Sequence, residues 1–253
     1  MKVAGMAAVV TGGGSGMGAI TARALAAAGA KVAVLDVNLA AAEATANEIG
    51  GVAAACDVSD AAGVEAAMAV ARAAHGPVRI VVNCAGVATA GRILGKDGPL
   101  SLDAFRRVVE INLIGTFNIL RLAAAEMSKL EPLDTAERGV IINTSSIAAF
   151  EGQVGQAAYA SSKGAVVALT LPAARELARF GIRVMTIAPG LIGTPMMLGF
   201  PQEVQDSLAA QVPFPNRLGR PEEFADLALH IISNVLLNGE TIRLDGAIRM
   251  GAK

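Results

Sequence analysis

The sequence predicts an α/β protein in which helices flank one doubly wound parallel sheet. Short apolar runs of strand-like length alternate with helix-like segments along the 253 residues. Hydrophobic residues make up 53% of the chain and charged residues 17%, a balance that suits a large buried core. No linker rich in Pro, Gly and Ser divides the chain, so we expect a single domain over residues 1–253.

The first half of the chain supplies alternating elements with clear stop signals. The expected strands are Ala7–Thr11, Lys31–Leu35, Val52–Cys56 and Ile80–Asn83, and the expected helices are Met17–Ala28, Asn38–Ile49 and Asp60–His75. Each strand is a short apolar run, as in a sheet covered on both faces. Gly29, Gly50 and Gly76 follow the helices as C-terminal stop signals, and Asn38 is placed to cap the second helix.

The second half continues the same alternation. Its expected helices are Leu102–Lys129, Gln156–Phe180 and Pro221–Ser233, and its expected strands are Val140–Thr144, Ile182–Ala188 and Glu240–Leu244. Two segments look irregular, Ala88–Leu100 and Gly190–Pro215. Long irregular segments in compact domains are usually functional, and the second one directly follows a strand. We therefore expect a substrate lid at about residues 190–215.

Composition excludes several classes of function. A net charge of −1 gives no basic footprint for nucleic acid. The apolar windows are broken by Gly, Pro or a charge before the roughly 18–20 residues that span a bilayer, so we expect no membrane segment. Two cysteines, Cys56 and Cys84, suit a reducing compartment such as the cytoplasm. With only two histidines in the chain, we expect no metal site.

A glycine-rich turn, Thr11-Gly-Gly-Gly-Ser-Gly-Met-Gly18, lies between the first strand and the first helix. Glycines permit a tight turn and close approach of a pyrophosphate, and the helix N-terminus attracts that anion. Asp36 closes the second strand, where a carboxylate accepts hydrogen bonds from ribose hydroxyls and repels a 2′-phosphate. The alternative is a flexible turn beside a solvated carboxylate. The context favours a Rossmann-type dinucleotide site that prefers NAD.

The single tyrosine, Tyr159, lies one helical turn before Lys163, so the two side chains share a helix face. A nearby ammonium favours the phenolate and lowers the phenol pKa, which makes such a tyrosine a candidate acid–base group. An ordinary tyrosine on an amphipathic helix is the alternative.

Ser145 and Ser146 end a strand at the edge where ligands bind, and Asn112 is a polar residue inside a helix. Adjacent strand residues point to opposite faces, so only one serine can face the site.

Together these motifs resemble the short-chain dehydrogenase/reductase family. Thr11–Gly18 is similar to its TGxxxGxG cofactor turn, and Asn83-Cys-Ala-Gly86 to its NNAG motif with Cys in place of the second Asn. Ser146 and Tyr159-x-x-x-Lys163 match its catalytic pattern. Asn112 falls at its catalytic Asn, and Pro189-Gly190 followed by Thr194 matches the segment that holds the nicotinamide carboxamide.

The resemblance implies roles for individual residues. The implied catalytic residues are Ser146, Tyr159, Lys163 and Asn112. The implied NAD-binding residues are Gly12, Ser15, Gly16, Met17, Gly18, Asp36, Asp57, Val58, Asn83, Cys84, Ala85, Gly86, Tyr159, Lys163, Pro189, Gly190, Ile192 and Thr194. Candidate substrate contacts are Ser146, Gln153, Gln156, Leu191 and Phe200.

Four longer segments resemble a particular branch of this family: Ala148–Tyr159, Arg183–Gly190, Gln211–Pro215 and Ile242–Met250. That branch oxidises the 3-hydroxyl of short-chain and 2-methyl-branched acyl-CoA with NAD, reversibly, in fatty acid metabolism. The resemblance also implies a homotetramer in which the helices Leu102–Lys129 and Gln156–Phe180 pair across an interface. It implies a mitochondrial matrix location if the source is eukaryotic.

Other functions remain open at this point. The same chemistry fits a hydroxysteroid or small secondary alcohol dehydrogenase, or a 3-oxoacyl carrier-protein reductase. Asp36 and the lack of Arg or Lys in Gly12–Gly18 argue against the reductase, which usually takes NADPH. A non-catalytic dinucleotide-binding protein is a more remote alternative.

Overall fold

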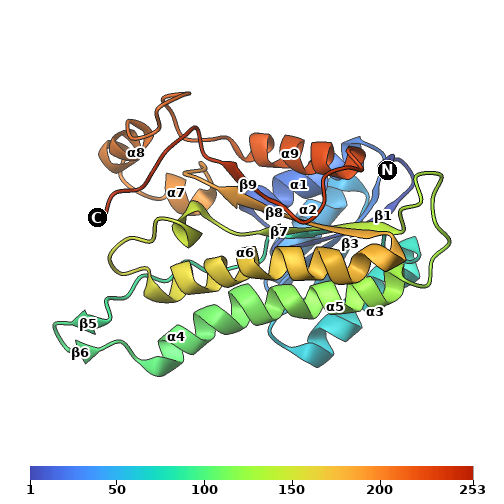
Figure 1. Ribbon diagram of the computed structural model, residues 1–253, viewed down its shortest axis with the longest axis horizontal. Coiled ribbons are helices and arrows are strands. Elements are labelled where there is room, and N and C mark those ends of the chain that lie inside the picture. The colour runs from blue at the N-terminus through green and yellow to red at the C-terminus, as the bar shows by residue number, and fades with distance from the viewer. Residues whose placement is uncertain (253) are drawn as a thin grey trace.

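The structure is a computed structural model that describes residues 1–252 and, at Met196, the backbone alone. Its centre is a 7-stranded sheet with the order β3-β2-β1-β4-β7-β8-β9, and all neighbouring strands are parallel (Figure 1). The strands are β1 (Ala7–Thr11), β2 (Lys31–Asp36), β3 (Val52–Ala55), β4 (Ile80–Asn83), β7 (Gly139–Thr144), β8 (Ile182–Pro189) and β9 (Thr241–Leu244). This architecture confirms the predicted fold class.

Helices cover both faces of the sheet. One face carries α1 (Gly16–Ala27), α2 (Leu39–Ile49) and α9 (Pro221–Ser233), and the other carries α3 (Ala61–His75), α5 (Gly115–Met127) and α6 (Ala157–Leu177) (Figure 1). Leu25 and Phe224 pack on the first face, and Met68 and Ile119 on the second. Because both faces are covered, the central strands are buried along their whole length, which explains their continuous apolar runs.

Local signals fix the helix ends. Asn38 caps α2, since its Oδ1 accepts a hydrogen bond from the Ala41 N–H at 3.2 Å. Asp60 caps α3 by accepting from the Ala62 and Gly63 N–H groups. Gly50 ends α2 in the left-handed conformation with φ 63°, a backbone shape that favours glycine.

The two segments predicted to be irregular contain short regular elements that the prediction missed. The segment 88–100 contains a small hairpin of β5 (Leu94–Gly95) and β6 (Gly98–Pro99). The segment 190–215 contains α7 (Pro195–Leu198) and α8 (Gln202–Ala209). Pro195 is the first residue of α7 and Pro201 immediately precedes α8. These prolines start helices, because the first helical turn needs no N–H from them.

The long helix predicted for Leu102–Lys129 is also divided. α4 (Leu102–Val109) and α5 are joined by a π-helical turn over Glu110–Ile114, which contains Asn112. A π-helical turn widens the helix by one residue and often marks a functional position. Hydrophobic periodicity does not distinguish such a turn from α-helix, so the sequence did not predict it.

The strand order reverses between β1 and β4, which lie side by side although β2 and β3 come between them along the chain. In open α/β sheets the ligand crevice opens at this switch point, beyond the C-terminal strand ends. Thr11, Asn83 and Thr144 end β1, β4 and β7 at this edge. The fold therefore gathers residues from distant parts of the chain at one place.

One helical stretch is long and apolar. By length and composition Leu102–Met127 meets the criterion for a membrane-spanning helix, but half of its apolar window is buried inside the protein, where α5 contacts β4 and β7. The core helices of soluble proteins meet the same criterion, so it is weak evidence for a span.

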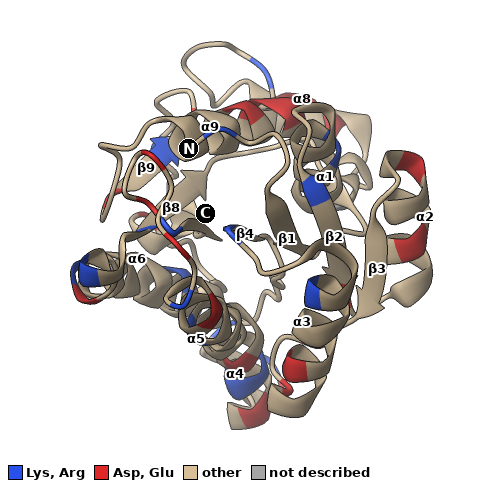
Figure 2. Cartoon of the chain, turned by 90° about the vertical axis from the view of Figure 1, so that its right-hand side faces the viewer, with Lys and Arg blue, Asp and Glu red and all other residues tan. Residues whose placement is uncertain are grey.

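In the view of Figure 2, basic segments are interspersed with acidic and uncharged ones over the outer helices.

Candidate active site

A cavity of about 740 Å³ opens at the C-terminal ends of the parallel strands. Its volume lies within the usual range for small-molecule sites. Most of the predicted site residues line it: Gly12, Ser15, Gly16, Met17, Gly18, Asp36, Asp57, Val58, Cys84, Ala85, Gly86, Ser146, Gln153, Gln156, Tyr159, Lys163, Pro189, Gly190, Leu191, Ile192, Thr194 and Phe200. The structure thus brings together residues from the first turn to the segment after β8.

The glycine-rich turn between β1 and α1 leaves room only for backbone. A Cβ added to Gly12, whose φ is 62°, would lie 2.8 Å from the backbone of Ala85. A Cβ on Gly18 would overlap the Gly12 carbonyl. Ser15, the N-cap residue of α1, makes no side-chain capping bond, so the first N–H groups of α1 stay available beside the cavity. This turn fits the pyrophosphate of a dinucleotide.

Asp36 ends β2 beside this turn and lines the same cavity. Its Oδ2 accepts a hydrogen bond from the Gly14 N–H at 2.9 Å, and its Oδ1 accepts one from the Asn38 N–H at 2.9 Å. The two bonds fix the carboxylate while each oxygen keeps further acceptor capacity. The arrangement fits a ribose diol next to the pyrophosphate turn.

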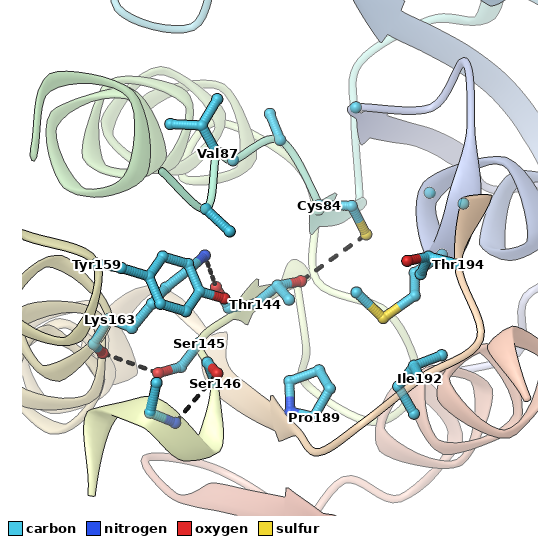
Figure 3. Close-up of a pocket in the computed structure, with 18 of the residues that line it drawn as sticks. Cys84, Val87, Thr144, Ser145, Ser146, Tyr159, Lys163, Pro189, Ile192 and Thr194 are labelled. Carbon is cyan, nitrogen blue, oxygen red and sulfur yellow. Dashed lines mark hydrogen bonds between the residues drawn. The ribbon is translucent and has the colours of Figure 1, made fainter. Parts of the chain in front are cut away.

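At the other end of the cavity, β7 and α6 position the predicted catalytic groups (Figure 3). Ser146 follows β7, and its Oγ accepts a hydrogen bond from the Ala148 N–H at 3.1 Å. Lys163 Nζ donates to the Thr144 carbonyl at 2.8 Å. Ser145 points away, because its Oγ donates to the Lys163 carbonyl at 2.8 Å. The two serines therefore have opposite directions, and Ser146 is the one beside Tyr159.

Burial controls the ionisation of Tyr159 and Lys163. It raises the pKa of the Tyr159 hydroxyl, and a hydrogen bond with Ser146 opposes this shift. It lowers the pKa of the Lys163 ammonium to about 8. The Lys163 ammonium lies 5.9 Å from the centroid of the Tyr159 ring. The lowered tyrosine pKa expected from the Tyr-Lys spacing is therefore absent in the free protein, because desolvation outweighs the distant charge.

This ionisation is directly measurable, because the chain has one tyrosine and no tryptophan. We expect the ultraviolet phenolate titration of the free protein to give a Tyr159 pKa above the ordinary value of about 10. Saturation with NAD should move that pKa downward, since the bound nicotinamide carries a positive charge. A free-protein pKa below the ordinary value would contradict the burial effect.

Two predicted residues lie behind the cavity and do not line it. Asn83 is buried between strands: its Nδ2 donates to Asn143 Oδ1 at 2.9 Å, so it joins β4 to β7 and makes no wall of the predicted cofactor site. Asn112 bonds Val87 twice, with its Oδ1 accepting from the Val87 N–H at 2.8 Å and its Nδ2 donating to the Val87 carbonyl at 2.9 Å. Its Nδ2 also donates to Ser162 Oγ at 3.0 Å. Asn112 thus holds the loop after β4 against α6.

Gly86 separates Asn112 from Lys163. A Cβ there would lie 3.1 Å from Asn112 Oδ1 and 3.3 Å from Lys163 Nζ. We expect Gly86→Ala to push these groups apart and to lower kcat about tenfold. Gly164→Ala is the matched control on α6, since its Cβ meets only the Ala149 carbonyl at 3.8 Å. Equal kcat values for the two variants would contradict this prediction.

Sequence reasoning missed several residues that line the cavity. These are Val37, Cys56, Val87, Ala88, Arg107, Ile111, Thr144, Ile147, Ala148, Pro195, Leu208 and Met250. Along the chain, Met250 is the farthest of these residues from the glycine-rich turn. The segment that leads to it is held by ion pairs. Arg243 contacts Glu151 at 2.6 Å and Asp245 at 2.7 Å, and Gln153 Nε2 donates to the Gly251 carbonyl at 3.2 Å. No local motif marks such residues.

The cavity has little capacity for metal or thiolate chemistry. Within residues 1–252, no group of three His, Cys, Asp or Glu side chains could hold a metal ion. Burial raises the pKa of the Cys84 thiol to about 12 and that of Cys56 to about 11. At neutral pH both cysteines are protonated and serve as small apolar wall residues.

Comparison with known proteins agrees with this site. A family model described as short chain dehydrogenase matches residues 6–204. The chain is 53% identical to a 3-hydroxyacyl-CoA dehydrogenase type-2 of Homo sapiens, over 98% of this chain and 97% of that protein. It is 48% identical to the protein of that name from Drosophila melanogaster, over 96% of each chain.

A solved structure supports the same relationship. The crystal structure of a 3-hydroxyacyl-CoA dehydrogenase type-2 from Mycobacterium avium is similar with a TM-score of 0.94 and 42% identity, over 98% of each chain. These findings confirm the family resemblance and the more specific resemblance of the segments such as Ala148–Tyr159. The chain therefore belongs to the short-chain dehydrogenase/reductase family and is an oxidoreductase.

Proposed function

We propose that this protein catalyses the reversible, NAD-dependent oxidation of the 3-hydroxyl of a short-chain or 2-methyl-branched 3-hydroxyacyl-CoA. One observation carries the chemical part of the proposal. A single cavity joins Ser146, Tyr159 and Lys163 at one end to the glycine turn and Asp36 at the other. The substrate class rests on the relatives, which are named 3-hydroxyacyl-CoA dehydrogenases.

The residues of the chain have separate tasks in this reaction. Ser146 donates its hydroxyl proton in a hydrogen bond to the substrate oxygen, and its Oγ is oriented by the Ala148 N–H. Tyr159, as phenolate, takes the proton of the substrate hydroxyl and returns it in the reverse direction. The Lys163 ammonium has three N–H donors, and one of them donates to the Thr144 carbonyl. The other two are available to ribose hydroxyls and the tyrosine oxygen. Asn112 keeps the loop at Val87 in place.

The bound NAD supplies the acceptor for the hydride that leaves the substrate carbon. The protein therefore has to bind, to orient and to move one proton. Leu191, Met197 and Phe200, together with Leu208 from α8, give the substrate end of the cavity an apolar wall that suits a short acyl group. The segment 190–215, with its two short helices, is the substrate lid in this proposal.

The choice of NAD over NADP rests on Asp36. We expect Asp36→Ala to weaken the use of NAD and to strengthen that of NADP, because the carboxylate no longer binds the ribose or repels a 2′-phosphate. The ratio of kcat/KM for the two cofactors should move toward NADP by about 100-fold. Asp60→Asn, outside the cavity and at the cap of α3, is the control. An unchanged ratio in Asp36→Ala would remove Asp36 from cofactor selection.

The function is tested by following NADH absorbance with a panel of alcohols. The panel contains 3-hydroxybutyryl-CoA, 2-methyl-3-hydroxybutyryl-CoA, a longer 3-hydroxyacyl-CoA and a 17β-hydroxysteroid. The proposal predicts that a short or methyl-branched acyl-CoA gives the highest kcat/KM. Oxidation of the steroid alone would keep the chemistry and overturn the substrate class, and no turnover despite tight NADH binding would favour a non-catalytic dinucleotide-binding protein.

We also propose a homotetramer that works in a reducing compartment, the cytoplasm or a mitochondrial matrix. The support is apolar surface on the helices expected to pair. Ile114 at the end of the π-helical turn and Phe117 on α5 are three residues apart and share a helix face, and they are 44% and 46% exposed. Leu171 on α6 is 43% exposed. Exposed apolar side chains on adjacent helices suit an interface between copies.

A further inference from the structure

Four charged side chains line the cavity among the described residues: Asp36, Asp57, Arg107 and Lys163. Lys163 lies at the catalytic end beside Tyr159. The other three line the opposite end, where Asp36 ends β2 and Asp57 comes shortly after β3. A dinucleotide brings two further negative charges on its pyrophosphate. Arg107 is thus the one cation that lines this acidic end of the cavity within residues 1–252.

Arg107 reaches the cavity from α4, across from the end of β3. Its Nη2 lies 3.5 Å from Asp57 Oδ2. The other carboxylate oxygen of Asp57, Oδ1, accepts from the Ser59 N–H at 3.0 Å and from the Ser59 hydroxyl at 2.6 Å. Asp57 is therefore fixed by its own turn, and the guanidinium lies against a rigid partner.

The cavity wall beside Arg107 continues along the same helix. Ile111, on the π-helical turn that follows α4, also lines the cavity. The two residues lie about one helical turn apart and so share a face of the helix. Val58, next to Asp57, lines the same end of the cavity. Arg107 and Ile111 from the helix, together with Asp57 and Val58 from the turn after β3, therefore form the wall at this end.

A planar aromatic base beside the Arg107–Asp57 pair suits this wall. The guanidinium of arginine is planar and stacks on aromatic faces while its N–H groups pair with a carboxylate. We propose that Arg107 covers the adenine base of bound NAD while it pairs with Asp57, and so is a cofactor-binding residue for the adenosine half. This inference rests on the proposed NAD-dependent function and adds a residue from α4 to it.

The alternative is an exposed ion pair without function. Arg107 is 61% and Asp57 is 36% exposed at the side chain, and such pairs contribute little to stability. Arg106 provides the comparison within the same helix. It is similarly exposed at 64%, pairs with Asp103 at 3.1 Å and does not line the cavity. The two neighbouring arginines therefore differ mainly in whether they face the cavity.

The test compares Arg107→Ala with Arg106→Ala by the fluorescence of reduced cofactor in titrations of the full protein. NADH and reduced nicotinamide mononucleotide, which lacks the adenosine half, are the two ligands. We expect Arg107→Ala to raise the Kd for NADH about five- to tenfold and to leave the Kd for the mononucleotide within about twofold. Arg106→Ala should leave both Kd values unchanged. In turnover the KM for NAD should rise more than kcat falls.

Several results would overturn the inference. An unchanged Kd for NADH in Arg107→Ala would do so, and so would equal losses for NADH and the mononucleotide, which indicate a general structural defect. Arg107→Lys keeps the charge without the plane, so most of the loss should remain, and full recovery would overturn the stacking contact. Wild-type protein that fails to bind NADH would overturn the proposed function itself, whereas normal wild-type binding with an unaffected Arg107→Ala overturns the role of Arg107 alone.

Discussion

We expect Tyr159→Phe to lower kcat by about 10²–10⁴-fold, the usual contribution of a positioned acid–base group. The phenylalanine keeps the ring and its packing but removes the only phenol of the chain. Ser146 still binds the substrate oxygen, but nothing then takes the proton. We expect the thermal unfolding temperature to stay close to that of the wild type, because burial already opposes the charged form of the Tyr159 hydroxyl.

The measurement is the steady-state rate of NADH formation, with NADH binding by fluorescence as the control for an intact site. Binding should be largely retained, since the glycine turn and Asp36 lie at the other end of the cavity. A variant whose turnover stays within about tenfold of wild type would remove Tyr159 from proton transfer. In that event another group near Ser146 would have to accept the proton.

Glu137→Gln lowers the free energy of unfolding by about 3–5 kcal/mol, because it leaves a buried guanidinium without its counter-charge. Glu137 Oε1 accepts from Arg183 Nε at 2.6 Å, and the two side chains are only 4% and 6% exposed. Arg183 also donates to the carbonyls of Ile231 and Ile232 at 2.9 Å each, so it cannot leave the interior easily. Arg183 thereby ties β8 to α9, the helix that covers one face of the sheet, and Glu137, just before β7, supplies its counter-charge.

A surface pair of equal length is the matched control. Arg23 and Glu48 approach to 2.6 Å, but their side chains are 40% and 55% exposed. Glu48→Gln should cost less than about 1 kcal/mol because water screens the pair. Both variants are compared by urea unfolding at one protein concentration, since association would shift the apparent stability. Equal losses for the two variants would contradict the account of the buried pair.

The fold was predictable because its signals are local. Each parallel strand is a short apolar run, and glycines such as Gly29 and Gly50 end the helices where the sequence indicated. The π-helical turn at Glu110–Ile114 was not predictable, since its residues have the same hydrophobic pattern as the helices on either side. The helices α7 and α8 were missed because they are short, with 4 and 8 residues, and lie in a segment that showed no sustained helical pattern.

The site was predictable where its residues follow strands. Parallel strands end at one edge, so motifs at Gly12, Asp36 and Ser146 had to meet once the strand order was formed. Arg107 and Met250 reach the same cavity from α4 and from the C-terminal segment. Their positions depend on how these segments pack in the folded chain, which no spacing in the sequence encodes.

The ionisation of the site was not predictable from spacing either. The distance between Tyr159 and Lys163 along the helix indicated an ammonium that lowers the tyrosine pKa. The structure shows a buried phenol with a raised pKa and an ammonium whose own pKa falls to about 8. Burial is a property of the whole fold, and here it outweighs the charge of the neighbouring residue.

The central claim is that a hydrogen leaves C3 of the acyl-CoA for NAD while Tyr159 takes the hydroxyl proton. The most direct test uses 3-hydroxybutyryl-CoA with deuterium at C3, followed by mass spectrometry of the recovered dinucleotide. The account predicts that the deuterium appears in the NADH formed by the wild type and that Tyr159→Phe forms almost none. Reduced dinucleotide without deuterium, or 3-oxoacyl-CoA formed without reduction of NAD, would contradict it.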